Sequence, residues 1–209
     1  MDILPFGHAS FKLRGKQATV VTDPYEGDGV HIKFPKHVEA DILTISHNHR
    51  DHNATELVGG SPFIVRGPGE YEIKGISIIG ISSFHDTEEG KTRGLNTMYR
   101  IEIDGVKIAH LGDVGHVLSS VQVDLLDGID VLMIPVGGMY TVDAEKASQI
   151  VSDIEPRIVI PMHDARSNKE LAPLDAFLKL LGKEGVLPVP KLTVSKDKLP
   201  PEMQVVILE

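Results

Sequence analysis

Three histidines and an aspartate occupy four of six consecutive positions in the segment His47-Asn48-His49-Arg50-Asp51-His52. The segment follows an apolar run over 41–46 whose β-branched residues are typical of a buried strand, and it precedes a short helix that we predict over 53–58. A turn between a strand and a helix is compact, so these side chains gather at one point. Neutral imidazoles and carboxylates are ligands that zinc, manganese and iron accept. The segment therefore predicts a metal site at the end of a buried strand.

The remaining pattern predicts an α/β protein. We expect strands over 8–13, 18–22, 63–65, 76–81, 98–103 and 106–111, and the last two are joined by Asp104-Gly105, a strong hairpin signal. We interpret residues 67–71 as a turn. After residue 112, apolar residues recur at helical spacing over 143–154 and 171–181. Strands are expected over 131–136, 157–161, 192–195 and 204–208. The whole chain, 1–209, is predicted to be a single domain of two pseudo-duplicated halves, roughly 1–105 and 106–209.

Composition excludes several classes of protein and partner. The chain has 209 residues and a net charge of -9, without a basic block, so nucleic acid and anionic membranes are not expected as partners. No apolar run approaches the roughly 18 residues of a membrane span. The first residues lack the basic and apolar regions of a signal peptide, and there is no cysteine. We therefore expect a cytoplasmic protein without disulfides or thiolate metal sites.

The six-residue segment matches the His-x-His-x-Asp-His signature of the metallo-β-lactamase superfamily, and the resemblance covers essentially the whole chain. Further positions match that family's later motifs: Asp23 after an early strand, His85 in an isolated third motif, Asp113 in a Gly-Asp pair, and His163 after a late strand. The opening, residues 6–10, is similar to a small prokaryotic branch that includes the ascorbate-phosphate lactonase and the N-acyl-phosphatidylethanolamine phospholipase. The resemblance implies a four-layer αββα sandwich with the site at one edge.

The resemblance also implies a division of ligands between two divalent metal ions, with zinc expected and manganese or iron as alternatives. His47, His49 and His85 would hold one ion, Asp51, His52 and His163 the other, and Asp113 would bridge them. A hydroxide between the ions would be the nucleophile, with Asp51 orienting it, so Asp51 and Asp113 are the expected catalytic residues. Seven protein ligands and one hydroxide make each ion about five-coordinate, with room for substrate.

Four other residues are expected to support the ligands or to contact substrate. Asp23 would brace the metal loop, His8 lies in the branch's opening motif, His116 follows the bridging aspartate, and Tyr140 lies in a glycine-rich turn that could stabilise an oxyanion. His110 lies in the strand predicted over 106–111, shortly before Asp113. Side chains alternate between the two faces of a strand, so His110 faces away from Leu111 and Asp113, and we do not expect it to be a ligand.

These expectations lead to a metal-dependent hydrolase. Two cations carry +4, and two aspartates with a hydroxide return -3, so the site stays slightly positive and would attract an anionic ester, lactone or phosphoester. Alternatives are a metal-stabilised binding protein without catalysis, and a phosphodiesterase or nuclease of the same superfamily. A di-iron redox enzyme is disfavoured, because those relatives replace the second histidine of the motif, here His49, with an acid and add a flavin domain. The sequence does not reveal the substrate or the oligomeric state; an oligomer is possible.

Overall fold

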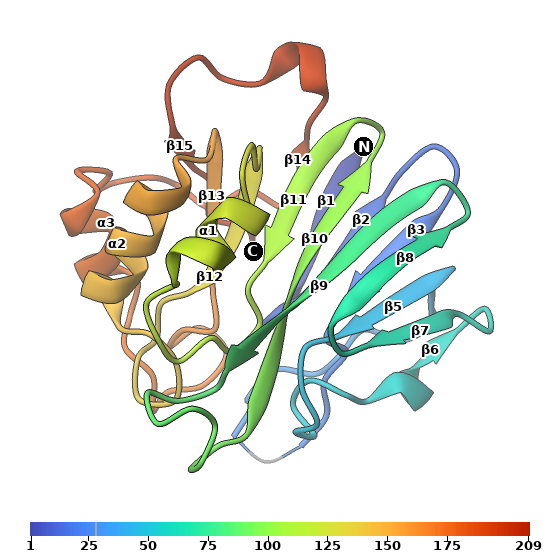
Figure 1. Cartoon of the computed structure of the whole chain (residues 1–209), viewed down its shortest axis with the longest axis horizontal. Coiled ribbons are helices and arrows are strands. Elements are labelled where there is room, and N and C mark those ends of the chain that lie inside the picture. Colours follow the sequence, from blue (N-terminus) through green and yellow to red (C-terminus); the bar gives the residue numbers. More distant parts are fainter. Residues whose placement is uncertain (28) are drawn as a thin grey trace.

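The computed structural model describes residues 1–27 and 29–209, and its main feature is a pair of β-sheets packed against each other (Figure 1). The first sheet contains, in spatial order, β14 (Leu192–Thr193), β1 (Asp2–Gly7), β2 (Ser10–Arg14), β3 (Thr19–Thr22), β5 (Ile42–Ile45) and β7 (Phe63–Arg66). The second contains β15 (Gln204–Val205), β13 (Ile158–Met162), β12 (Val131–Pro135), β11 (Val106–His110), β10 (Leu95–Ile103), β9 (Ile76–Phe84) and β8 (Gly69–Ile73). A separate pair, β4 (Val38–Glu39) and β6 (Val58–Gly59), lies beside the first sheet.

Strand periodicity decides which side chains fill the space between the sheets. In β11, Ile108 joins the core between the sheets whereas Ala109 joins the core under the helices. The same alternation separates Met133 from Leu132 in β12, because successive side chains of a strand point to opposite faces. Both faces of β12 and β13 are buried, so these two strands are apolar throughout rather than alternating.

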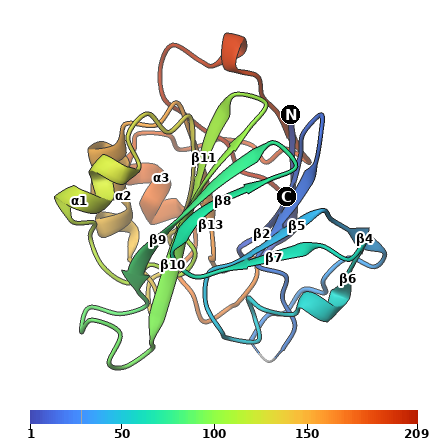
Figure 2. The same cartoon turned by 45° about the vertical axis from the view of Figure 1, so that its right-hand side comes forward.

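The outer layers of the sandwich differ from each other. The helices α1 (Ser120–Leu125), α2 (Ala144–Ile154) and α3 (Asp175–Leu180) all lie over the second sheet (Figure 2). The outer face of the first sheet is covered instead by β4, β6 and neighbouring loops, around a small core that includes Leu43 and Val58. The predicted α/β sandwich is confirmed, but among the described residues the layer over the first sheet contains no α-helix.

The ends of the parallel strands position the candidate site. β3, β5 and β7 run parallel in the first sheet, and β11, β12 and β13 run parallel in the second. Asp23 follows β3, the His47–His52 segment follows β5, Asp113 follows β11 and His163 follows β13. The carboxyl ends of parallel strands meet at one edge of a sheet, which is where ligands bind in open α/β sheets. Residues from distant parts of the sequence are thus collected at one edge of the sandwich.

Several elements differ from the sequence prediction. The strand expected over 8–13 is β2, which begins at Ser10, and β1 was not expected. A tight turn at Gly7 and His8 reverses the chain between the two strands. Residues 67–71 are not only a turn, since Gly69 begins strand β8. The helix predicted over 171–181 is shorter, α3, and the one predicted over 53–58 is a 3-10 helix, Thr55–Leu57. Helix α1 was not expected, because it has only six residues and none of them is buried, so the sequence shows no apolar face at helical spacing.

The chain changes from the first sheet to the second between Arg66 and Gly69, upstream of the predicted boundary at 105 between the halves. Each sheet combines an antiparallel set of strands with a parallel set, but the pseudo-duplication itself stays a prediction. Within the described residues, no helix has the length and apolar character needed to cross a membrane.

The turn at Gly67 and Pro68 packs closely on β9 at Gly80, and this generates a prediction. A Cβ at Gly80 would lie 2.4 Å from the carbonyl oxygen of Gly67. Gly80→Ala should therefore lower the free energy of unfolding by about 2 kcal/mol, measured by urea denaturation. The matched control is Gly59→Ala, whose Cβ would find its nearest neighbour at 3.6 Å, and it should be neutral or slightly stabilising. Equal stability of the two variants would contradict the close approach.

Candidate metal centre

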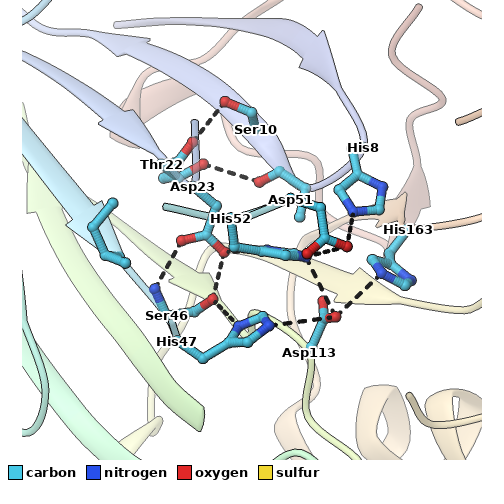
Figure 3. A network of polar contacts seen from close by, with 12 residues as sticks. His8, Ser10, Thr22, Asp23, Ser46, His47, Asp51, His52, Asp113 and His163 are labelled. Carbon is cyan, nitrogen blue, oxygen red and sulfur yellow. Dashed lines mark hydrogen bonds and ion pairs between the residues drawn. The ribbon is translucent and has the colours of Figure 1, made fainter. Parts of the chain in front are cut away.

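The histidine segment after β5 is held by a buried carboxylate, that of Asp23. Its oxygens accept hydrogen bonds from the backbone N–H of Ser46 (2.8 Å), the hydroxyl of Ser46 (2.5 Å) and Nδ1 of His52 (2.9 Å) (Figure 3). Because the Ser46 hydroxyl donates to Asp23, its oxygen accepts from Nδ1 of His47 at 2.9 Å. Both imidazoles therefore donate from Nδ1 away from the centre and direct Nε2 into the site. A hydrogen-bonded Nδ1–H is the usual support of a metal-binding histidine.

The carboxylate of Asp113 lies at the centre of the site and is almost fully buried. Its Oδ2 is 3.2 Å from Nε2 of His163, 3.3 Å from His52, 3.4 Å from His85 and 3.9 Å from His47. Figure 3 shows Asp113 between the imidazoles of His47, His52 and His163. These histidines come from loops after strands of both sheets. A single oxygen atom is thus placed close to four nitrogen donors.

The loop before Asp113 follows a path that only glycine permits. Gly112 has φ +54°, and a Cβ there would lie 2.5 Å from both the Cβ of Ser46 and Oδ1 of Asn96. Oδ1 of Asn96 accepts the backbone N–H of Asp113 at 3.0 Å, and its amide nitrogen donates to the Leu111 carbonyl at 2.9 Å. The absence of a side chain at Gly112 therefore lets the second sheet bring its carboxylate up to the histidines of the first.

Potential ligands fall into three overlapping groups whose donor atoms lie within 4.8 Å of one another. The groups are His47, His49 and His85; His47, His52 and Asp113; and His8, Asp51, His52 and His163. The seven predicted ligands are all present, and His8 joins the last group. His49 is exposed and the Asp51 side chain is 34% exposed, so the site opens to solvent on this side.

The donor set fits metal ions. The buried atoms without a hydrogen-bond partner among the described residues include Nε2 of His8, His47 and His52 and Oδ1 of Asp113. Leaving buried polar groups unpaired costs roughly 1–3 kcal/mol each, and a bound cation would satisfy these atoms together. Two donors that bind one zinc ion at about 2.1 Å in tetrahedral geometry are about 3.4 Å apart. The separations around Asp113 Oδ2, 3.2 to 3.9 Å, match that spacing.

The electrostatics of the site favour the protonation states that a metal requires. Burial lowers the pKa of His47 to about 3 and that of His8 to about 4, which keeps both imidazoles neutral. Burial opposes ionisation of Asp113, but His163 and His52 outweigh it and hold the pKa of the carboxyl well below its usual range. Burial also opposes the charged form of His52, yet Asp113 and Asp23 raise its pKa well above the ordinary value. A bound cation would take the place of that proton on His52.

Two predicted site residues and one predicted bystander lie outside the cluster. His116 donates from Nδ1 to the Val117 carbonyl and accepts the Phe84 N–H at Nε2. It therefore supports the segment that carries His85, and its expected contact with substrate stays a prediction. Tyr140 donates to Glu170 at 3.1 Å and is not among the grouped ligands. His110 faces the first sheet, where Nε2 donates to the Ala9 carbonyl at 2.7 Å, in agreement with its strand parity.

Three supporting residues were not found from the sequence: Ser46, Asn96 and Ser167. Ser46 connects Asp23 to His47, Asn96 orients the Asp113 backbone, and the Ser167 hydroxyl lies 3.0 Å from Nδ1 of His8. Ser46 is adjacent to the histidine segment, so its position was a usable signal. Asn96 and Ser167 are single polar residues far from the residues they orient, and only the fold brings them into contact.

A cavity of about 500 Å³ borders the site on the side of His47 and His49. Two arginines, Arg66 and Arg93, also line it. The guanidinium of Arg93 stacks on the ring of Tyr140, 4.3 Å from the ring centroid. The side chain of Arg93 is therefore held in place beside an opening that leads to predicted metal ligands.

Comparison with known proteins agrees with this geometry. The family model described as beta-lactamase superfamily domain matches residues 2–163. A Thermococcus onnurineus protein named UPF0173 metal-dependent hydrolase is 30% identical over 84% of this chain and 90% of its own length. A protein of the same name from Thermoplasma acidophilum is 27% identical over 88% of this chain and 92% of its own.

Among solved structures, a metallo-β-lactamase superfamily protein from Thermotoga maritima superposes with a TM-score of 0.82 and 36% identity, over 99% of this chain and 97% of that one. The matched family model, the metal-ligand cluster at the edge of two stacked sheets and the full-length relatives point the same way. The chain belongs to the metallo-β-lactamase superfamily and, within it, to the UPF0173 family of metal-dependent hydrolases.

Proposed function

We propose that the protein is a hydrolase with two metal ions, most simply zinc, that acts on a small anionic ester, lactone or phosphoester. The observation that carries the proposal is the position of Asp113 Oδ2, within 3.2–3.9 Å of Nε2 atoms that belong to both predicted half-sites. His47, His49 and His85 would hold one ion, Asp51, His52 and His163 the other, and Asp113 would bridge them.

When bound, such ions lower the pKa of a water molecule to near 7 and polarise the bond to be cleaved. The protein's own residues then have separate tasks. Asp113 is buried and held ionised, so it supplies a fixed negative charge between the half-sites. Asp51 is partly exposed at the mouth of the site, where its carboxylate is placed to accept a proton from an attacking water and to orient it. Asp23 keeps His52 in the tautomer that presents Nε2.

The cavity beside His47 and His49 supports an anionic substrate. Arg66 and Arg93 supply positive charge to its wall in a protein whose net charge is -9. Arginine matches the planar geometry of carboxylate and phosphate oxygens. Arg93 stacks on Tyr140, whose hydroxyl donates a hydrogen bond to Glu170. The side chain is thus already restricted, so it loses less conformational entropy when it binds an anion. A small phosphorylated or carboxylated metabolite fits a cavity of about 500 Å³.

Metal content is the first prediction. The wild-type protein, purified without chelators and reconstituted with zinc or manganese, should bind close to two ions per chain by elemental analysis. Asp113→Ala should lose at least one ion, because one carboxylate serves both half-sites. His110→Ala is the matched control: this histidine is equally buried but faces the other sheet, so the metal content should be unchanged. Equal loss in both variants, or a wild-type content near zero, would contradict the dinuclear site.

The second prediction concerns the reaction. The value of kcat/KM should rise with pH and then level off, because the attacking water must lose a proton. Asp51→Asn is nearly isosteric and should keep the fold, yet it should lose about 100-fold in kcat/KM. Hydrolysis in heavy-oxygen water should place one labelled oxygen in the product within a single turnover. Trapping of a covalent acyl- or phosphoryl-enzyme, or wild-type turnover of Asp51→Asn at unchanged metal content, would exclude the mechanism.

The third prediction tests the substrate class. A panel of lactones, carboxylic esters and phosphoesters, with and without a second anionic group, should show a preference for the anionic members. Arg93→Ala should reduce kcat/KM for these substrates by about 10- to 100-fold, the value of a charge-assisted hydrogen bond of roughly 1.5–3 kcal/mol. Neutral substrates should be affected little. Arg100→Ala removes a half-buried arginine outside the cavity and should leave both classes unchanged. An equal effect in both variants would argue against recognition by Arg93.

A further inference from the structure

His8 occupies an unusual position between β1 and β2. Its φ of 55° lies in the left-handed region, where a residue with a Cβ is strained. Its carbonyl accepts the backbone N–H of His163 at 3.2 Å, and its ring centroid is 4.4 Å from that of His163 and 4.9 Å from that of His52. A strained backbone is here combined with a side chain that is buried against two predicted ligands of the second half-site.

The direction of one hydrogen bond fixes which nitrogen of His8 is free. The Ser167 hydroxyl donates its only hydrogen to the Asp164 carbonyl at 3.1 Å. Its oxygen can therefore only accept from Nδ1 of His8, 3.0 Å away. Neutral His8 then carries its hydrogen on Nδ1 and a lone pair on Nε2. The arrangement repeats that of His47, whose Nδ1 donates to a serine, Ser46, already engaged as a donor.

The Nε2 atom of His8 is buried and has no hydrogen-bond partner among the described residues, a property it shares with Nε2 of His47 and His52. It lies 3.5 Å from Oδ2 of Asp51 (Figure 3). A lone pair and a carboxylate oxygen repel each other unless a cation lies between them. Their separation matches the distance of about 3.4 Å between two donors on one zinc ion.

We infer that His8 is a further ligand of the second metal ion, together with Asp51, His52 and His163. The inference rests on the proposed dinuclear centre and adds an eighth protein ligand to it. The second ion would then have four ligands of its own besides the bridging Asp113. The first ion, bound by His47, His49 and His85, would keep the open position. That ion is the one beside the cavity lined by Arg93, so the substrate oxygen would bind there.

The test compares His8→Ala with the wild type and with His110→Ala, the buried histidine outside the ligand groups. Metal-free full-length protein is titrated with Co²⁺ against a competing chelator, which gives two stepwise dissociation constants. In His8→Ala, the affinity of the half-site formed by Asp51, His52 and His163 should fall by more than the 10- to 100-fold typical of losing a residue that only supports a ligand. The affinity of the other half-site should stay unchanged. Ser167→Ala, which removes only the partner of Nδ1, should stay within that smaller range.

Proton NMR of the Co²⁺-loaded proteins counts the coordinated imidazoles directly. Each contributes one strongly shifted exchangeable N–H signal, so His8→Ala should lose one signal and His110→Ala none. A crystal structure of zinc-loaded wild type gives the same answer if His8→Ala does not fold, since Nε2 of His8 should lie about 2.1 Å from the ion.

The outcomes separate the two proposals. Wild type that binds two ions, while His8→Ala keeps the second-site affinity and the full set of shifted signals, would overturn the role of His8 only. A distance between His8 Nε2 and the ion that is too long for coordination would do the same. Wild type that binds fewer than two ions would overturn the dinuclear function itself.

Discussion

The buried carboxylate of Asp113 is the constraint on which the rest of this structure depends; only 3% of its side chain is exposed. A buried charge of this kind is costly unless it is paired, and here the surrounding groups are imidazoles. Bringing them around one oxygen requires loops from both sheets to converge, and the backbone is strained where they do. His8, Asp23 and His163 have φ values of 55°, 36° and 52°. Each such residue costs of order 1–3 kcal/mol and is retained because the surrounding structure fixes it.

The orientation of the imidazoles follows from hydrogen bonds made away from the centre. In each case Nδ1 of the ring donates a hydrogen bond: His52 to Asp23, His47 to Ser46 and His8 to Ser167. The Nε2 atoms of the three rings are therefore directed inward before any ion binds. This preorganisation explains why the cluster contains several buried nitrogen atoms without partners. It also gives His8, from the first hairpin of the chain, the same electronic character as residues of the histidine segment.

The local parts of this design were readable from the sequence, and the long-range parts were not. The histidine segment after β5 could be identified from residue type and spacing, whereas Asp113 and His163 were identified by their match to the family's later motifs. The parity of His110 followed from the two-residue period of a strand. Strand β8 was missed because the Gly67-Pro68-Gly69 pattern indicates a turn, while the pairing of Gly69 with Gly80, 11 residues further along, has no local signal. The roles of Ser167 and of Arg93 on Tyr140 depend on contacts between loops, which have no periodic signature.

The ligands come from loops that belong to different sheets. His47, His49 and His52 extend from the first sheet, whereas His85, Asp113 and His163 extend from the second. Ions held by both sets would act as a cross-link between the two sheets of the sandwich at one edge. Their binding free energy would be coupled to closure of that edge, and free metal would add stability in proportion to the logarithm of its concentration. At low metal concentration the edge would lose this cross-link, so local opening there, and with it cleavage by proteases, would increase.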